Sequence, residues 1–228
     1  MPASRRRRPA VLFDLDGTLI DSTALILASA RHAFDGVTRH SYTEAEWLTG
    51  MGMPLRTQLG RFAASEADVE PLTERYKAFQ RRHHDDLVRA FDDVLATLDE
   101  LRRRGHPMAI VTGKGGVMAR HGLAHCGLDF DVIVAADDCV RHKPDPEPVL
   151  RALDLLGIAP EQAVFVGDSP HDMAAGNAAG VVTVGALWGP FAPGDLAAAD
   201  HLLRRLADLP ALLDRLPAAA SALAVDEP

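Results

Sequence analysis

The sequence predicts an α/β protein with a doubly wound parallel sheet and an inserted all-helical segment. Two observations carry this prediction. Between residues 92 and 184, short apolar runs alternate with helical patterns, which is typical of a parallel sheet covered by helices on both faces. Between about residues 36 and 89, by contrast, only helical patterns occur. This part of the chain is therefore expected to form a separate helical layer.

The strands of the predicted sheet are short apolar runs bounded by turn residues, as expected for strands that are buried on both faces. The first is Val11-Leu12-Phe13. The later runs are residues 108–111, 132–134, 163–166 and 181–184, with a further candidate near 201–202. Helical patterns fill the intervals at residues 92–104, 116–126, 146–156 and 171–179, and a closing helix is expected within 195–216.

The helical patterns of the insertion are separated by a break rich in glycine and proline at residues 50–54. Asp21 and Ser22 can cap a first helix that ends near Gly36. Further helices are predicted at residues 43–49, 55–63 and 66–87. We therefore expect a core of residues 9–20 and 88–216, a helical insertion at 21–87, and disordered tails at 1–8 and 217–228.

Composition and charge restrict the classes of function. The 228-residue chain has a formal net charge of −8, which gives no support for nucleic acid as a partner. The basic cluster Arg5–Arg8 is expected in a solvated tail, and no apolar run approaches the ~18 residues of a membrane span. Cys126 and Cys139 lack metal-site spacing and are expected to be reduced thiols, which favours a cytoplasmic location. The adjacent His83 and His84 also lack partners at metal-ligand spacing, so solvent or core-edge positions are expected for them.

Two carboxylates, Asp14 and Asp16, follow the first strand directly. In open parallel sheets, ligands bind at the carboxyl ends of the strands. Two acids held at such an edge repel each other unless a cation or a shared proton compensates their charge. The pair therefore predicts a metal-assisted site in which one Asp is the nucleophile and the other is the acid and base.

Further polar residues are expected at the same edge of the sheet. Thr112, Gly113 and Lys114 follow one predicted strand, and Asp168 follows another. Lys143 precedes a helix from whose start it can reach this edge. The Thr112 hydroxyl and the Gly113 amide can donate hydrogen bonds to the oxygens of a phosphoryl group, and Lys114 is expected either to contact the substrate or to be solvated.

The charged residues of this set suit phosphoryl transfer, which depends mainly on positioning and electrostatic stabilisation. Asp14, Asp16 and Asp168 offer hard oxygen ligands of the kind that Mg²⁺ prefers. Lys143 would hold Asp14 ionised and balance the charge of the phosphoryl oxygens. The sequence therefore predicts a magnesium-dependent phosphoryl-transfer site.

These residues resemble the motifs of the haloacid dehalogenase superfamily, in particular its branch of phosphoglycolate and pyrophosphate phosphatases. The resemblance covers about residues 11 to 213 in the order of the family motifs. It implies the Rossmann-like α/β core of that superfamily, with the helical insertion as its cap. The matching motifs are Asp14-Leu15-Asp16-Gly17-Thr18, Thr112, Lys143, and Gly167-Asp168-Ser169 with Asp172.

The resemblance also implies a role for each acid. Asp14 attacks phosphorus and forms an aspartyl-phosphate, while Asp16 protonates the leaving group and then activates the hydrolytic water. Mg²⁺ would be held by the Asp14 carboxylate, the backbone carbonyl of Asp16 and Asp168, with Asp172 supporting these ligands from behind. The residue types alone place the side chain of Asp16 on the metal, whereas the family pattern frees it for proton transfer.

In the family, the cap closes over the site, excludes water and selects the leaving group. Residues 50–56 resemble the cap loop that faces the active site, so Arg56 is a candidate for a second anionic group of the substrate. Lys77 lies in a long amphipathic helix and is expected on its solvated face.

The resemblance implies hydrolysis of a small phosphorylated metabolite, either a phosphoglycolate-like phosphomonoester or pyrophosphate, without a nucleic-acid or membrane partner. A phosphosugar mutase of the same superfamily is the main alternative, because it would also use Asp16. A catalytically silent binding module on the same fold is a remote alternative. Both a monomer and a homodimer are compatible with the sequence.

Overall fold

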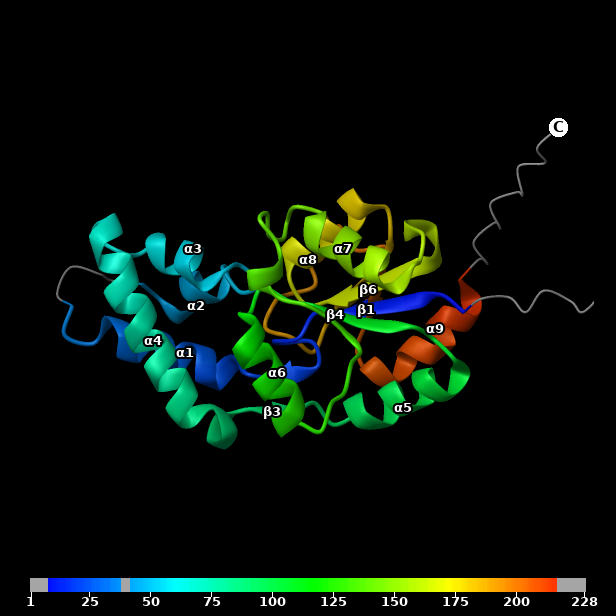
Figure 1. The fold of residues 1–228 in the computed structure, drawn as a ribbon, viewed down its shortest axis with the longest axis horizontal. Coiled ribbons are helices and arrows are strands. Elements are labelled where there is room, and N and C mark those ends of the chain that lie inside the picture. The colour runs from blue at the N-terminus through cyan, green and yellow to red at the C-terminus, as the bar shows by residue number, and fades with distance from the viewer. Residues whose placement is uncertain (1–7, 38–41, 217–228) are drawn as a thin grey trace, which may run out of the picture.

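The structure of the protein is a computed structural model that describes residues 8–37 and 42–216. A six-stranded sheet with the strand order β5-β4-β1-β6-β7-β8 lies at its centre (Figure 1). All strand pairs of this sheet are parallel. Its strands are β1 (Ala10–Phe13), β4 (Met108–Val111), β5 (Val132–Val134), β6 (Ala163–Gly167), β7 (Val182–Ala186) and β8 (His201–Leu203).

The strand order reverses at β1, which lies between β4 and β6. Phe13, the last residue of β1, is in register with Ile110 of β4 and Val166 of β6. The residues that follow these strands therefore leave the sheet at one edge. A reversal of this kind opens a crevice at the carboxyl ends of the strands, where ligands bind in doubly wound sheets.

Helices cover both faces of the sheet (Figure 1). Along β1, Val11 and Phe13 belong to one buried apolar cluster, and Ala10 and Leu12 belong to the other. The first cluster includes side chains of α5 (Val94–Arg104), α6 (Gly116–His125) and α9 (Leu209–Arg215), and the second those of α7 (Glu147–Leu156) and α8 (Pro170–Ala179). Each fully buried large apolar side chain contributes about 1.5–3 kcal/mol. Short 3-10 helices lie at η1 (Ala136–Asp138), η2 (Pro160–Gln162) and η3 (Leu206–Asp208).

The helical insertion has an apolar core of its own. Its helices are α1 (Thr23–Phe34), α2 (Glu44–Leu48), α3 (Leu55–Gly60) and α4 (Glu66–Leu87). Trp47 is fully buried at the centre of this core, where its ring packs against Phe34, Phe62 and Tyr76. The insertion lies beside the carboxyl edge of the sheet, at the left of Figure 1.

The predicted fold class is confirmed, and α4 has the predicted bounds. Besides the short 3-10 helices, two strands were missed: β2 (Ile20–Asp21) and β3 (Arg89–Ala90) form an antiparallel pair where the chain enters and leaves the insertion. Strands of two residues are too short to show a periodicity. Smaller differences occur at helix and strand ends, since α3 ends at Gly60 rather than at residue 63 and β7 runs on to Ala186.

The division into a core and an inserted domain stays a prediction. The predicted disordered tails lie outside the described residues, apart from Arg8, whose guanidinium is 3.4 Å from a carboxylate oxygen of Asp214. Within the described ranges, no helix combines the length and the apolar character of a membrane span.

Candidate active site

Three buried carboxylates gather at the edge of the sheet. Asp14 follows β1, Asp168 follows β6, and Asp172 lies in the first turn of α8. Their ligand oxygens all lie within 4.8 Å of one another. Burial raises the pKa of Asp14 to about 7, although the positive charge of Lys143 opposes this rise. Burial also raises the pKa of Asp168 well above its usual range, and the charges of Asp14 and Asp172 add to the effect.

Lys143 supplies the positive charge of this cluster. Its side chain is almost completely buried, and its Nζ atom lies 2.5 Å from Asp172 Oδ1, 2.9 Å from Asp14 Oδ1 and 3.1 Å from the Val111 carbonyl oxygen. An ammonium group has three protons, so three partners can satisfy it. Burial lowers the pKa of Lys143, but Asp14 and Asp172 outweigh this effect and hold the pKa above its usual range. The ammonium group is therefore charged.

The carboxylate of Asp172 is fully engaged within the protein. Its Oδ1 atom accepts from Lys143, and its Oδ2 atom accepts from the backbone amide of Ser169 at 3.0 Å and from the Ser169 hydroxyl at 2.6 Å. The Ser169 hydroxyl in turn caps α8 by accepting from the Asp172 amide. This arrangement suits a residue that positions Lys143, whereas the predicted support of Asp172 for the metal ligands stays a prediction.

Asp168 is only half engaged. Its Oδ1 atom accepts from the Thr18 hydroxyl at 3.0 Å, whereas its buried Oδ2 atom has no hydrogen-bond partner. Gly17 and Gly189 lie so close to the Asp168 side chain that a Cβ atom on either of them would overlap it. An unpaired carboxylate oxygen in such a cradle is costly without a cation. Together with Asp14, Asp168 therefore presents the oxygen donors that a hard divalent metal ion prefers.

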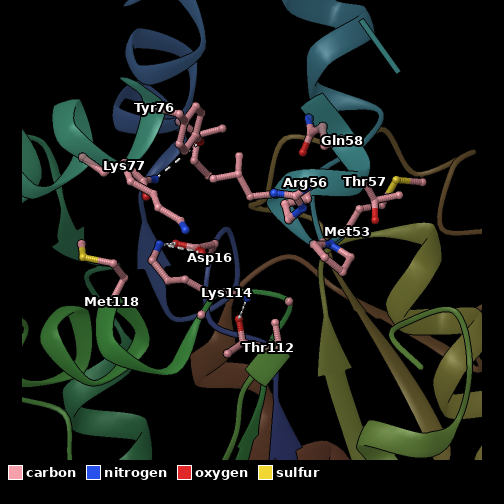
Figure 2. Close-up of a pocket in the computed structure, with 18 of the residues that line it drawn as sticks. Asp16, Met53, Arg56, Thr57, Gln58, Tyr76, Lys77, Thr112, Lys114 and Met118 are labelled. Atoms are coloured by element: carbon pink, nitrogen blue, oxygen red, sulfur yellow. Dashed lines mark hydrogen bonds and ion pairs between the residues drawn. The ribbon is translucent and has the colours of Figure 1, made fainter. Parts of the chain in front are cut away.

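The side chain of Asp16 lies apart from this carboxylate group. Its two oxygens lie 2.7 and 2.8 Å from Lys114 Nζ, and the Ser22 hydroxyl donates to Oδ1 at 2.6 Å. Figure 2 shows Lys114 reaching Asp16 at the base of a pocket, below Tyr76 and Arg56 of the insertion. The two acids that follow β1 therefore occupy different environments: Asp14 is beside Lys143 and Asp168, and Asp16 is held by Lys114 and Ser22.

A cleft of about 700 Å³ lies above these acids. Its core side includes Asp14, Asp16 and the loop of residues 112–115, so it contains the predicted Thr112, Gly113 and Lys114. Its opposite wall comes from residues 51–58 and from α4. The predicted residues at the carboxyl ends of β1 and β4 thus border a single hollow of the molecule.

The helical insertion contacts the core directly through its loop at residues 50–54. Gly52 has a left-handed backbone conformation with φ +91°, and a Cβ atom on it would lie 3.1 Å from the Ser169 hydroxyl oxygen. A Cβ atom on Gly113 would overlap the Gly52 carbonyl oxygen. Glycine permits both close approaches because it has no side chain. The insertion therefore covers one side of the cleft.

Two charged residues of the insertion, Arg56 and Lys77, lie on the cleft wall and are paired with acids of the same helical layer. Arg56 lines the cleft, and its guanidinium forms ion pairs with Glu70 and Glu66. Lys77 is exposed, as expected for a solvated helix face, and that face borders the cleft; its Nζ atom lies 3.5 Å from Glu74. Both side chains are about half exposed.

Three residues support the site although no role in the site was predicted for them. Ser22 was expected to cap α1, but its hydroxyl binds Asp16 instead, and it makes no side-chain cap. Thr18 donates to Asp168, and the Trp188 indole Nε1–H donates to the Thr18 carbonyl oxygen at 2.9 Å. The available sequence signal is that Thr18 and Ser22 follow Asp16 within six residues, while Trp188 is distant in sequence and gives none.

A parallel sheet whose carboxyl edge holds buried aspartates and a buried lysine beneath a helical insertion defines a hydrolase of the phosphatase class. Residues 11–186 match the model of the haloacid dehalogenase-like hydrolase family. The chain therefore belongs to this family, as its motifs predicted.

Known relatives agree with this placement. The chain is 39% identical over 208 residues to the pyrophosphatase PpaX of Bacillus velezensis, covering 90% of this chain and 95% of the relative. It is 37% identical over 210 residues to the PpaX of Bacillus mycoides, covering 90% and 97%. A hydrolase from Pseudomonas syringae has a similar structure, with a TM-score of 0.83 and 26% identity over 92% of this chain and 99% of the other.

Proposed function

We propose that the protein is a Mg²⁺-dependent phosphatase that hydrolyses a small phosphorylated metabolite through an aspartyl-phosphate on Asp14. The observation that carries this proposal is the concentration of cations around the cleft. The sequence has only three lysines in a chain of net charge −8. Lys77 and Lys114 line the cleft and Lys143 contacts Asp14 below it. A small substrate with more than one anionic group suits this environment.

The residues divide the chemistry as follows. A carboxylate oxygen of Asp14 attacks phosphorus and forms the P–O bond of the aspartyl-phosphate as the bond to the leaving oxygen breaks. Asp16, which must first be protonated and released from Lys114, gives its proton to that leaving oxygen and later takes a proton from the water that hydrolyses the intermediate. Lys143 balances the charge of Asp14, and the Thr112 hydroxyl and the Gly113 amide donate to the phosphoryl oxygens.

The donor set at the sheet edge supports a divalent cation. The carboxylates of Asp14 and Asp168 and the backbone carbonyl of Asp16 would hold Mg²⁺, an ion that prefers oxygen ligands. The bound ion would supply positive charge that offsets the repulsion between these carboxylates and an incoming phosphate. The unpaired Oδ2 atom of Asp168 supports this assignment.

We infer that pyrophosphate is the preferred substrate, and a phosphoglycolate-like monoester is the second choice. Both carry a second anionic group beyond the phosphoryl group that is transferred, and Lys114 and Lys77 lie on the cleft where such a group would be received. The relatives named pyrophosphatase support the first choice. The two unpaired cysteines, Cys126 and Cys139, support a reducing and therefore cytoplasmic location, in which the protein would act as a monomer or homodimer.

The test is a comparison of kcat/KM values, measured with Mg²⁺, for pyrophosphate, phosphoglycolate and p-nitrophenyl phosphate. The last compound lacks a second anionic group and is the matched control. We expect pyrophosphate to be turned over fastest and EDTA to abolish phosphate release. Equal kcat/KM values for pyrophosphate and the control would contradict the proposed role of the lysines. Conversion of β-glucose 1-phosphate to glucose 6-phosphate, without free phosphate, would show a mutase instead.

A further inference from the structure

A cluster of three histidines and one aspartate lies away from the cleft, where the end of α4 meets α6. His84 and Asp85 belong to the last turn of α4, and His121 and His125 are one helical turn apart on α6. His84, Asp85 and His121 have ligand atoms that all lie within 4.8 Å of one another. We propose that this cluster is a second metal site, which binds a borderline transition-metal cation such as Zn²⁺.

The carboxylate of Asp85 is the centre of the cluster. Its Oδ1 atom lies 2.9 Å from His84 Nδ1, 2.8 Å from His121 Nε2 and 3.5 Å from His125 Nδ1. Ligand atoms about 2.0 Å from a tetrahedral zinc ion lie about 3.3 Å from each other. The three distances from Asp85 Oδ1 to the histidine nitrogens bracket that value. A small movement of the side chains would therefore admit the ion.

The hydrogen bonding of His125 prepares it as a ligand. Its Nε2 atom lies 3.2 Å from the Val88 carbonyl oxygen, which can only accept a hydrogen bond. The proton of the neutral ring is therefore on Nε2, and the lone pair of Nδ1 faces Asp85. A histidine that donates its other ring N–H to a carbonyl is the usual arrangement in metal sites. A lone pair directed at a carboxylate requires a proton or a cation between them.

His84 adds a buried side to the site. Its side chain is fully buried, and its Nε2 atom has no hydrogen-bond partner. Gly122 of α6 makes room for the ring, since a Cβ atom there would lie 3.3 Å from His84 Nε2. His84 Nδ1 lies beside Asp85 and, together with Asp85 and His121, gives three ligand atoms within 4.8 Å of one another; His125 would have to move closer to become a fourth ligand. The side chains of Asp85 and His121 are about half exposed, so an ion can enter from solvent.

The nitrogen and oxygen donors of the cluster indicate which metal ion it would bind. Imidazole nitrogens with one carboxylate suit zinc and its neighbours in the transition series, whereas Mg²⁺ prefers oxygen ligands throughout. The cluster therefore differs in chemistry from the Asp14 and Asp168 pair at the sheet edge. An ion bound here would join the last helix of the insertion to α6 of the core, close to the β2–β3 pair through which the chain leaves the insertion (Figure 1).

The experiment is a calorimetric titration of the full chain with Zn²⁺ in excess Mg²⁺, with Co²⁺ absorption as a second measurement. We expect one Zn²⁺ per chain, lost in the double variant His121→Ala/His125→Ala. The matched control is His83→Ala, which removes a neighbouring histidine that stacks on Phe79 instead of facing the cluster. Co²⁺ should give visible bands of nitrogen ligation in the wild type and in His83→Ala, but not in the double variant.

Two further variants identify the source of any binding. Asp168→Asn removes a carboxylate of the cleft and should leave the zinc stoichiometry unchanged; zinc binding that disappears in Asp168→Asn and persists in His121→Ala/His125→Ala would overturn the proposal. Asp85→Asn removes a charged ligand and should weaken binding by more than the roughly 10–100-fold that loss of a group supporting a ligand causes. Equal zinc affinity in Asp85→Asn and the wild type would mean that zinc binds only the two histidines of α6. This result would also overturn the proposal.

Discussion

The two sides of the cleft hold their charges in different ways. On the core side, Lys143 and Asp172 are buried and fixed by several short contacts each. On the insertion side, Arg56 and Lys77 are about half exposed and paired with nearby glutamates. Buried charges lose much when one partner is removed, whereas exposed ion pairs contribute little. In the proposed mechanism, the reaction chemistry therefore belongs to the buried side of the cleft, while the residues of the insertion proposed to affect substrate preference can change at low cost in stability.

The largest effect is expected at Asp14. Replacement of Asp14 by Asn removes the proposed nucleophile and should lower kcat/KM for p-nitrophenyl phosphate by about 10⁴-fold or more. The loss of activity is measured as the rate of phosphate release under saturating Mg²⁺, and circular dichroism shows whether the variant keeps its fold. Asp21→Asn, which changes an exposed carboxylate on β2, is the control and should keep full activity. If Asp14→Asn turned over at the wild-type rate, the core side of the cleft would not carry the reaction.

The second effect is on stability and concerns Lys143. Lys143→Ala leaves the buried carboxylates of Asp14 and Asp172 without their common partner, which should lower the free energy of unfolding by about 3–5 kcal/mol. Lys77→Ala, on the exposed wall, should change it by less than about 0.5 kcal/mol. Urea denaturation of both variants gives the comparison, and similar losses in the two would remove the proposed difference between the walls.

The third effect is a pH dependence of the free energy of unfolding, which arises from the buried carboxyl groups on the core side of the cleft. Burial raises the pKa of Asp14 from 3.8 to about 7. A carboxyl group with a higher pKa in the folded state binds its proton more tightly when folded, so its contribution to stability falls as the pH rises from about 4 through 7. The raised pKa of Asp168 acts in the same direction. Lys143 contributes no slope here, because it stays protonated in both states below its ordinary pKa of 10.5.

In EDTA, we therefore expect the free energy of unfolding of the wild type to fall between pH 5 and pH 8. The fall should exceed that of Asp14→Asn by roughly 1–3 kcal/mol, since one pKa unit corresponds to about 1.4 kcal/mol. Urea denaturation at the two pH values measures the difference. Parallel pH profiles of the two proteins would mean that Asp14 does not titrate in this range. Added Mg²⁺ should flatten the wild-type profile if the cluster binds the ion.

The sequence predicted the core side of the cleft better than the insertion side. Asp14, Thr112 and Asp168 each follow an apolar run directly, and parallel strands bring their carboxyl ends together, so local pattern and topology suffice to place them. The bounds of α4 were predicted for a similar reason, because twenty-two residues of helical periodicity form a long signal.

Contacts between distant side chains were not predictable from the same patterns. Lys77 was expected on a solvated helix face and is exposed, but the periodicity could not show that this face borders the cleft. The His84 cluster was missed because Asp85 and His121 are 36 residues apart on different helices. The four-residue spacing of His121 and His125 on one helix was the available signal. It indicates a cluster only once the end of α4, with His84 and Asp85, is known to pack against α6. The orientation of helices relative to each other depends on tertiary packing, which local periodicity does not encode.

The smallest effect is expected at Arg56 and tests the insertion side directly. Because its guanidinium is already paired with Glu66 and Glu70, Arg56→Ala should raise KM for pyrophosphate by no more than about tenfold, or ~1.4 kcal/mol, and leave p-nitrophenyl phosphate unaffected. Glu70→Gln weakens the competing ion pair without removing the arginine. If Arg56 contacts the second anionic group, Glu70→Gln should lower KM for pyrophosphate while Arg56→Ala raises it. Unchanged KM values in both variants would instead make Arg56 a surface ion pair and leave substrate selection to Lys77 and Lys114.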